Sequence, residues 1–324
     1  MTNRVEELAP DAAVAFADRA TPAVFRGIAA DWPAVRTAHP GVYLARFDTG
    51  KPVGLAIAPP EADGRLGYTP DLSALTFVRD SGTIAELFDR LDAATRSPRP
   101  PAIAAQAVMV PEVLPGFEAE NQIGLVPQGV VPRIWIGNCV RVATHHDMNS
   151  NIAVVMAGRR RFTLFPPDQV ANLYIGPIEF TPAGTPVGLF DPDEPDFALY
   201  PRALEAMKHA QVAELGPGDA LFIPHMWWHH VRSLDPVSIL VNYWWDEAPA
   251  PQPGLAPIDA MVHAILAFSG LPETQRAAWR AMFDDFVFGG APDHVPAERR
   301  GIRGALSEES KARVRRQLGQ MMAR

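Results

Sequence analysis

Two short histidine-rich segments carry the residue types best suited to chemistry. The first is the run THHD at residues 144–147, and the second is the run HMWWHH at residues 225–230. Residues i and i+2 of a strand point to the same side, so His145 and Asp147 share one side and His146 points to the other. Two ligands on one side, with one histidine from a distant strand, make a two-histidine, one-carboxylate set. Such a set holds one triangular face of an octahedral ferrous ion and leaves three positions open.

The second segment supplies the distant histidine. A lone His-X-Asp is more often an ordinary surface pair, and the second segment strengthens the metal interpretation. It follows the apolar run ALFIP at residues 220–224, and Trp227 and Trp228 are suited to excluding water from a metal. His229 falls where a strand would re-enter the core, and His230 is its rival for the position of third ligand.

A run of three arginines, Arg159 to Arg161, opens another apolar segment. Strand alternation puts Arg160 on the same side as Phe162 and Leu164, which is an apolar side. A buried charge without a partner is costly, and a guanidinium can bind a carboxylate through two parallel hydrogen bonds. We therefore expect Arg160 to bind an anion, and its two neighbours to be solvated.

The elements that position these residues are short strands. Between residues 102 and 245 the apolar runs have strand length, and Gly, Pro, Asn or Asp bound each of them. They read AIAAQAVMV, RIWIG, NIAVVMA, RFTLF, ALFIP and VSILVNYWW. No long helical pattern separates them, which favours an antiparallel sandwich or barrel over crossover βαβ units. The AGRR sequence after NIAVVMA predicts a tight hairpin, and GPGD at residues 216–219 predicts a turn into ALFIP.

The flanking segments are mixed or helical. Helical apolar spacing is present at residues 83–94, 258–268 and 272–288 and from Ser307 onward. The sequence thus predicts a mixed α/β segment at 1–100 that packs on the core, a β core at 101–250 and a helical region at 251–324. The helices of the last region are expected to pack either on the β core or against a second copy, which would make a homodimer.

Composition narrows the class of protein. The chain has 324 residues, 48% of them hydrophobic, and its 29 Lys and Arg against 37 Asp and Glu give a net charge of −8. This balance disfavours binding to nucleic acid, which needs a basic face. The single cysteine, Cys139, excludes an internal disulfide framework and a Cys-rich zinc site, and it fits a cytoplasmic protein. The first residues form no apolar leader and no run approaches 18 apolar residues, so we expect no membrane span.

The motifs also occur in a recognisable order. The sequences GNCVRVATHHD, AGRRRFTLFPPDQVANLY, GPGDALFIPHMWWHHV and VNYWW resemble those of JmjC-type cupin-like dioxygenases. TPAVFRGIAADWPAV upstream extends the likeness to roughly residues 20–250, and it is greatest to the branch that contains the asparaginyl hydroxylase of hypoxia-inducible factor. The resemblance implies a double-stranded β-helix, or jelly-roll, that binds Fe(II) and 2-oxoglutarate.

The resemblance also assigns roles to residues. It implies that the metal ligands are His145, Asp147 and His229. It also implies that Arg160 binds the distal carboxylate of 2-oxoglutarate, and that the amides of Asn151 and Asn242 lie near its keto-acid end. Asn242 lies inside an otherwise apolar strand, where a buried amide must be hydrogen-bonded. Two positions depart from the hydroxylase pattern, because Val142 stands in place of a carboxylate-binding Thr and Ile103 in place of a Tyr. The pocket is expected to be kept with altered carboxylate contacts.

We therefore expect an Fe(II)- and 2-oxoglutarate-dependent oxygenase that uses dioxygen, with hydroxylation of a protein or peptide side chain as the leading activity. One alternative is a small-molecule hydroxylase. Another is a non-catalytic cupin-like binding or regulatory protein, which the complete triad argues against and which Val142 and Ile103 leave open. A third is a cupin enzyme with another metal and no keto acid, such as an isomerase, which would leave Arg160 without a role.

Overall fold

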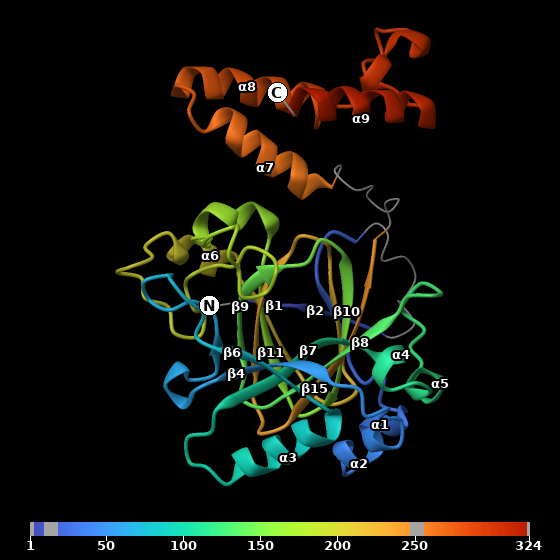
Figure 1. The fold of residues 1–324 in the computed structure, drawn as a ribbon, viewed down its shortest axis with the longest axis vertical. Helices are drawn as coiled ribbons and strands as arrows, with labels where there is room; N and C mark the ends of the chain where they lie inside the picture. The colour runs from blue at the N-terminus through green and yellow to red at the C-terminus, as the bar shows by residue number, and fades with distance from the viewer. Residues whose placement is uncertain (1–2, 10–18, 247–255, 323–324) are drawn as a thin grey trace. The chain divides into compact units, whose positions relative to one another are not determined.

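The structure is a computed structural model, and it describes residues 3–9, 19–246 and 256–322. The chain divides into two compact units, Met1–Pro249 and Ala250–Arg324, which are described separately. The expected boundary between the β core and the helical region falls among residues 247–255, which lie outside the described residues. Figure 1 shows the first unit as a group of strands with helices around them.

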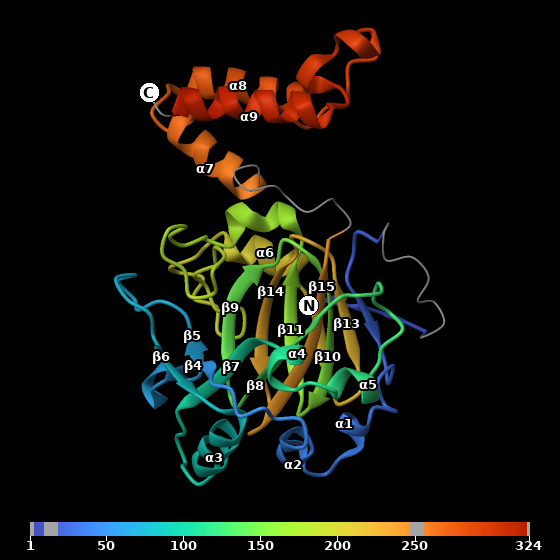
Figure 2. The ribbon, with the colours of Figure 1, turned by 45° about the vertical axis from the view of Figure 1, so that its right-hand side comes forward.

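Two β-sheets face each other in the first unit (Figure 2). The six-stranded sheet has the order β1 (Asn3–Arg4), β12 (Gln211–Leu215), β11 (Arg160–Phe165), β14 (Trp228–Ser233), β9 (Arg141–His146) and β5 (Arg65–Leu66). The nine-stranded sheet has the order β2 (Glu6–Leu8), β3 (Ala23–Phe25), β13 (Ala220–Ile223), β10 (Ser150–Ala157), β15 (Ser238–Trp245), β8 (Pro132–Gly137), β7 (Ala102–Met109), β4 (Val53–Ala58) and β6 (Val78–Gly82). Among the described residues, ten of the thirteen strand pairs are antiparallel, and the three parallel pairs involve the short strands β1, β2 and β5. The predicted fold class, a mainly β jelly-roll with flanking α/β and helical segments, is confirmed.

Strand β10 shows why some strands of the nine-stranded sheet are apolar along their whole length. All eight of its residues are buried, because its two sides face two different cores. Ala153 and Val155 pack between the sheets with residues such as Phe162. Ile152 and Val154 point the other way, into a core covered by helices. A strand buried on both sides reads as a continuous apolar run, whereas a strand with one wet side alternates.

One turn differs from its prediction. The AGRR sequence does not close a hairpin, because β10 and β11 lie in different sheets. The chain crosses between the sheets at Gly158, which has φ of 68°. A Cβ atom at this position would lie 2.3 Å from the carbonyl oxygen of Val237, so the crossing requires glycine. The GPGD turn leads into β13 as predicted, and there too the chain changes sheet.

Helices from the first part of the chain cover the outer side of the nine-stranded sheet. They are α1 (Pro33–Arg36), α2 (Pro40–Ala45), α3 (Ile84–Thr95), α4 (Val110–Val113) and α5 (Phe117–Glu120). α3 begins with a capping box in which Thr83 and Glu86 each bind the other's backbone N–H, and it buries Leu87 and Leu91 against the sheet. β4 and β6, from the same region, extend this sheet beyond β7. Shorter helices are η2 (Pro60–Ala62), η3 (Pro167–Asn172) and α6 (Ala203–His209).

The second unit is helical. It contains α7 (Pro257–Phe268), α8 (Glu273–Phe286) and α9 (Glu308–Met322), with two short 3₁₀ turns, η4 (Ala297–Arg299) and η5 (Gly301–Arg303). α7 and α8 bury none of their residues. In the part of the chain that the structure describes, no helix combines the length and the apolar character that crossing a membrane would require.

Candidate metal centre

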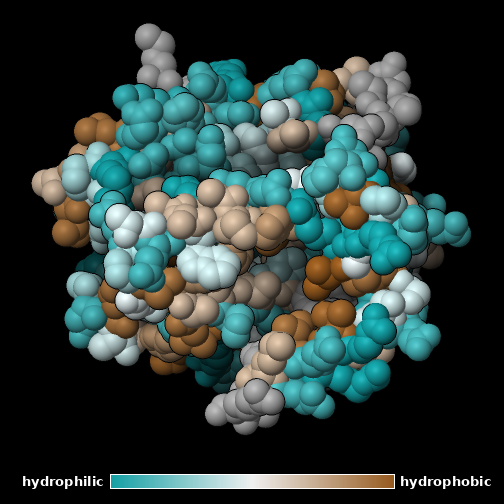
Figure 3. Space-filling model, turned by 90° about the horizontal axis from the view of Figure 1, so that it is seen from above, coloured by the Kyte–Doolittle hydropathy of each residue, from teal (hydrophilic) through white to brown (hydrophobic). Residues whose placement is uncertain are grey.

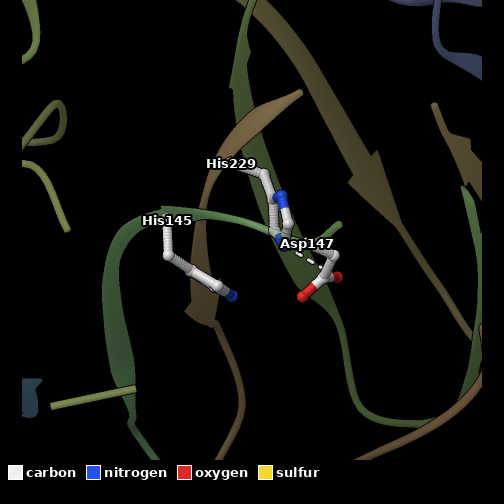
Figure 4. A group of neighbouring side chains, drawn as sticks. All are labelled: His145, Asp147 and His229. Carbon is white, nitrogen blue, oxygen red and sulfur yellow. Dashed lines mark ion pairs between the residues drawn. The ribbon is translucent and has the colours of Figure 1, made fainter. Parts of the chain in front are cut away.

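Three side chains converge between the two sheets (Figure 4). His145 lies near the end of β9, Asp147 follows that strand directly, and His229 lies on β14. β9 and β14 are antiparallel neighbours, and their register places His145 opposite His229. One potential ligand atom from each of the three residues lies within 4.8 Å of the other two, and His229 Nε2 is 3.7 Å from Asp147 Oδ2. The spacing predicted from strand alternation is thus realised in space.

Both histidines present the same nitrogen to this centre. The Nδ1 atom of His145 lies 2.8 Å from the carbonyl oxygen of Ala143, and that of His229 lies 3.0 Å from the carbonyl oxygen of Trp227. A carbonyl oxygen only accepts hydrogen bonds, so each Nδ1 carries a proton and each Nε2 is the nitrogen that faces the centre. Burial, with a smaller contribution from the nearby His229, lowers the pKa of His145 to about 4. His145 is therefore neutral near pH 7, as a metal ligand must be.

The carboxylate of Asp147 is held from the nine-stranded sheet. Asn151 on β10 donates a 3.2 Å hydrogen bond from Nδ2 to Asp147 Oδ2. The backbone of Asp147 is fixed as well, because its carbonyl oxygen accepts a 2.9 Å bond from the N–H of Met226. Hydrogen bonds therefore hold both the side chain and the main chain of Asp147, directly after the end of β9.

The six predicted site residues line one pocket of about 40 Å³ between the sheets. They share it with side chains from both sheets, namely Trp135, Val142, Ala153, Phe162, Val231, Leu240 and Trp244. The structure therefore brings together the three expected ligands, the expected carboxylate anchor and the two amides. Their roles remain predictions, and the geometry shows only that they meet.

Arg160 is buried in this pocket without a counter-charge. Its side chain is 7% exposed, and its Nε and one Nη donate to the hydroxyl and carbonyl oxygens of Ser238 at 2.8 and 3.4 Å. In the described ranges it forms no ion pair. Burial lowers the pKa of Arg160 to about 10, so it stays charged at neutral pH. Because an unpaired buried charge is costly, this arrangement fits an anion in the pocket.

A second unpaired group points to the same conclusion. The Nε1 atom of Trp244 is buried and has no hydrogen-bond partner among the described residues. Buried donors are normally satisfied, and Trp244 lines the same pocket as Arg160. Two histidine Nε2 atoms, a carboxylate, an unpaired guanidinium and an unpaired indole N–H suit a divalent metal with a carboxylate-bearing ligand. The residues present thus fit Fe(II) and a keto acid.

The two departures noted in the sequence lie in different places. Val142 lines the pocket beside Arg160 and offers no hydroxyl there. Ile103 does not line it: the residue packs into the outer core beneath the helices. Instead its neighbours Ala104, Ala105 and Gln106 line an adjoining cavity of about 20 Å³ that Arg160 also borders. The position that the resemblance gives to Ile103 is therefore not part of this pocket, because the side chain packs into the outer core.

His146 and His230 point away from the centre, as neighbours of ligands should in a strand. The His146 ring meets Trp228 edge-on, with centroids 4.6 Å apart. His230 Nε2 lies 3.8 Å from Asp191 Oδ1 on the outer side of the six-stranded sheet, and burial lowers its pKa. Arg161 pairs with Glu214 at 2.5 Å, and the solvated role expected for it agrees with its partial exposure.

His230, Asp191 and Asp193 form a second group that could hold an ion by distance alone. Guanidinium groups already occupy its carboxylates, with Arg65 3.1 Å from Asp191 and Arg232 3.1 Å from Asp193. Positive charges at these positions oppose a cation, so we assign the group as a salt-bridge network. The sequence did not reveal it, because residues 174–202 have no periodic pattern.

Two further pocket residues, Trp135 and Trp244, were missed as well, and so was Ser238, which accepts hydrogen bonds from Arg160. The alternation in RIWIG puts Trp135 on one face with Arg133. Ser238, Asn242 and Trp244 are separated by even numbers of residues in one strand, so they share a face. This signal was available in the sequence but carried no chemical pattern by itself.

The fold and site together define a jelly-roll with a two-histidine, one-carboxylate centre and a buried guanidinium beside it. Comparison with known families agrees: residues 11–250 match the family described as "Cupin-like domain". The match covers well over half of the chain, and the protein belongs to this family.

Individual relatives match over a shorter stretch. The chain is 38% identical over 113 residues to "Lysine-specific demethylase JMJ31" of Arabidopsis thaliana, which covers 34% of this chain and 20% of that protein. It is 34% identical over 131 residues to human "HSPB1-associated protein 1", covering 40% and 25%. It is 30% identical over 132 residues to "tRNA wybutosine-synthesizing protein 5" of Danio rerio, covering 39% and 37%. The chain therefore spans well under half the length of these relatives.

Proposed function

We propose that this protein is an Fe(II)- and 2-oxoglutarate-dependent oxygenase that uses dioxygen to hydroxylate a protein or peptide side chain. The observation that carries the proposal is the unpaired, buried Arg160 in the same pocket as the triad of His145, Asp147 and His229. A metal centre alone would suit many reactions. A metal centre with a buried cation beside it supports one that also binds a carboxylate.

Each pocket residue has a defined task in this reaction. His145 and His229 offer their Nε2 atoms to the iron, and Asp147 offers a carboxylate that offsets the charge of the metal. Arg160 binds and orients the distal carboxylate of 2-oxoglutarate. Val142, Phe162 and Val231 are apolar and keep water from the reacting groups. Bound iron would supply the oxidising chemistry, and the protein supplies position and electrostatics.

Anaerobic titration of the Fe(II)-loaded protein with 2-oxoglutarate tests this proposal. Keto-acid chelation of iron gives a metal-to-ligand charge-transfer band in the visible spectrum, and we expect the band to rise to saturation. A cupin enzyme without a keto acid, or a barrel that has lost the cosubstrate, would give no band. Absence of the band in metal-loaded wild-type protein would contradict the proposal.

The substrate class is inferred from sequence motifs. Likeness to the branch of the hypoxia-inducible factor hydroxylase comes from ordered sequence motifs and favours a polypeptide side chain. A small-molecule hydroxylase and a non-catalytic binding protein are the alternatives, and succinate release that depends on an added peptide would separate them. The net charge of −8 disfavours a nucleic-acid partner, and we expect no membrane partner. The exposed free thiol of Cys139 fits a cytoplasmic location.

We also propose that the C-terminal helices bind a second copy of this chain. Twelve large apolar side chains in residues 256–322 are 40 to 77% exposed, and brown side chains lie exposed among teal ones in Figure 3. A stable interface buries about 800 Å² per partner, and exposed apolar side chains in this number are suited to one. No large apolar side chain in the described part of this unit is buried, and a second copy of the same unit would cover them.

A further inference from the structure

We propose that Trp135 is a positioning residue for the metal ligand Asp147 and acts on it through Asn242 and Asn151. The inference rests on the proposed metal site and goes beyond it, since Trp135 touches no ligand nitrogen or oxygen directly. It assigns a role in metal binding to an indole N–H three hydrogen bonds away from the carboxylate it orients.

The hydrogen bonds run in one line across three neighbouring strands. Trp135 Nε1 on β8 donates to Asn242 Oδ1 on β15 at 2.9 Å. Asn242 Nδ2 donates to Asn151 Oδ1 on β10 at 3.4 Å. Asn151 Nδ2 then donates to Asp147 Oδ2 at 3.2 Å. β8, β15 and β10 are adjacent in the nine-stranded sheet, so the backbone fixes the spacing of the line.

The two ends of the line give it a direction. An indole N–H can only donate, and an ionised carboxylate can only accept. Each amide between them has one donating and one accepting end and can adopt either of two orientations. Of the four combinations, only one satisfies all three hydrogen bonds. The indole N–H fixes the orientation of Asn242 and so reinforces the arrangement in which Asn151 presents nitrogen, and not oxygen, to Asp147.

The two amides have little access to water, which makes their orientation depend on these hydrogen bonds. Asn151 is 4% and Asn242 is 2% exposed, so water does not readily replace a lost partner, and unsatisfied buried amides are disfavoured. Without the indole donor, Asn242 loses the hydrogen bond that its Oδ1 accepts and is held only by the 3.4 Å bond from its Nδ2 to Asn151. If the amide of Asn242 rotated by 180°, its Oδ1 would face Oδ1 of Asn151. Rotation of the Asn151 amide would relieve this repulsion. The carboxylate of Asp147 would then meet an amide oxygen and lose its fixed orientation.

The test is metal affinity in the full chain without 2-oxoglutarate. Trp135→Phe removes the N–H and keeps an aromatic side chain. Titration with Mn(II) should show affinity lower by about 10- to 100-fold, the range for loss of a group that orients a ligand. The Co(II)-loaded variant should also show a shifted visible absorption spectrum, because that spectrum reports ligand geometry and a purely structural change would leave it unaltered.

Trp32→Phe is the matched control. It also removes an indole N–H, which donates to the carbonyl oxygen of Gln122 at 2.7 Å, but it lies in the outer core. It should leave both the Mn(II) affinity and the Co(II) spectrum unchanged. A similar loss of affinity in this control would show that the effect is general destabilisation and would overturn the inference.

Asn242→Leu removes the middle of this series of hydrogen bonds. It provides a second test of the inference if the Trp135→Phe variant does not fold. It should weaken Mn(II) binding to a similar extent. In the double variant the two losses should not add, since both break the same line. Additive losses, or unaltered affinity in either single variant, would overturn the role of Trp135 and leave the metal site standing. Wild-type protein that binds neither ion would instead contradict the metal site itself.

Discussion

The Nε atom of Arg160 donates a 2.8 Å hydrogen bond to the hydroxyl oxygen of Ser238. Ser238 is fully buried on β15 of the nine-stranded sheet, whereas Arg160 begins β11 of the facing sheet. The guanidinium is therefore oriented from across the pocket by a neutral group. Ser238 fixes the orientation of the guanidinium without neutralising its positive charge, which remains able to bind an anion.

Replacing the guanidinium should separate cosubstrate binding from metal binding. Arg160→Ala removes charge-assisted hydrogen bonds worth about 1.5–3 kcal/mol, so the KM for 2-oxoglutarate should rise about 10- to 100-fold while Mn(II) affinity stays near that of wild type. Arg159→Ala is the control, because Arg159 is solvent-exposed and pairs with Asp235. Unchanged dependence on 2-oxoglutarate in Arg160→Ala would place the anchor elsewhere.

Removing the hydroxyl of Ser238 should have a smaller effect of the same kind. Ser238→Ala loses one neutral contact to the guanidinium, worth about 1 kcal/mol, and should raise the KM for 2-oxoglutarate about fivefold with little change in kcat. Ser238→Thr keeps the hydroxyl and should restore most of the binding. Equal KM values for the Ala and Thr variants would argue that Ser238 contributes packing alone.

Loss of a ligand should abolish metal binding. His145→Ala and Asp147→Ala each leave two of the three protein ligands, and neither variant should retain iron after gel filtration or form succinate. The control is His225→Ala, since His225 belongs to the same histidine-rich segment but is exposed. Turnover in either ligand variant would show that the triad is assigned incorrectly.

The stability of the metal-free protein should depend on His145 at mildly acidic pH. Its pKa is lowered from 6.5 to about 4 in the folded state, so between these values the unfolded chain binds more protons. Stability is therefore lost as the pH falls from about 6.5 towards 4. Urea unfolding at pH 7.5 and pH 5 should show a smaller drop for His145→Gln than for wild type. An equal drop in both proteins would mean that other groups cause it.

Charging the exposed helical surface should separate the proposed dimer. Leu266 is 76% and Phe288 is 77% exposed, so the double substitution Leu266→Glu and Phe288→Glu should cost the fold little. Light scattering should then report a monomer in place of a dimer. Leu199→Glu, at a residue 63% exposed in the first unit, should remain dimeric. A wild-type monomer at micromolar concentration would rule the dimer out.

The sequence predicted those features that short-range patterns encode. The apolar runs at β8, β10 and β15 indicated buried strands, and the i, i+2 spacing of His145 and Asp147 indicated a shared side. Which sheet each strand joins depends on contacts between distant segments, and AGRR was misread as a hairpin for that reason. Trp135 was missed because its partner, Asn242, lies 107 residues further along the chain.

The double burial of β10 has a consequence for how a substrate reaches the pocket. One side of this strand forms the pocket wall and the other packs into the outer core, so β10 cannot move by itself without disrupting both cores. Burial on both sides therefore disfavours movement of this strand as the route of access. Any gating belongs to the loops that leave the strands, where Met148 and Met226 are exposed beside Asp147.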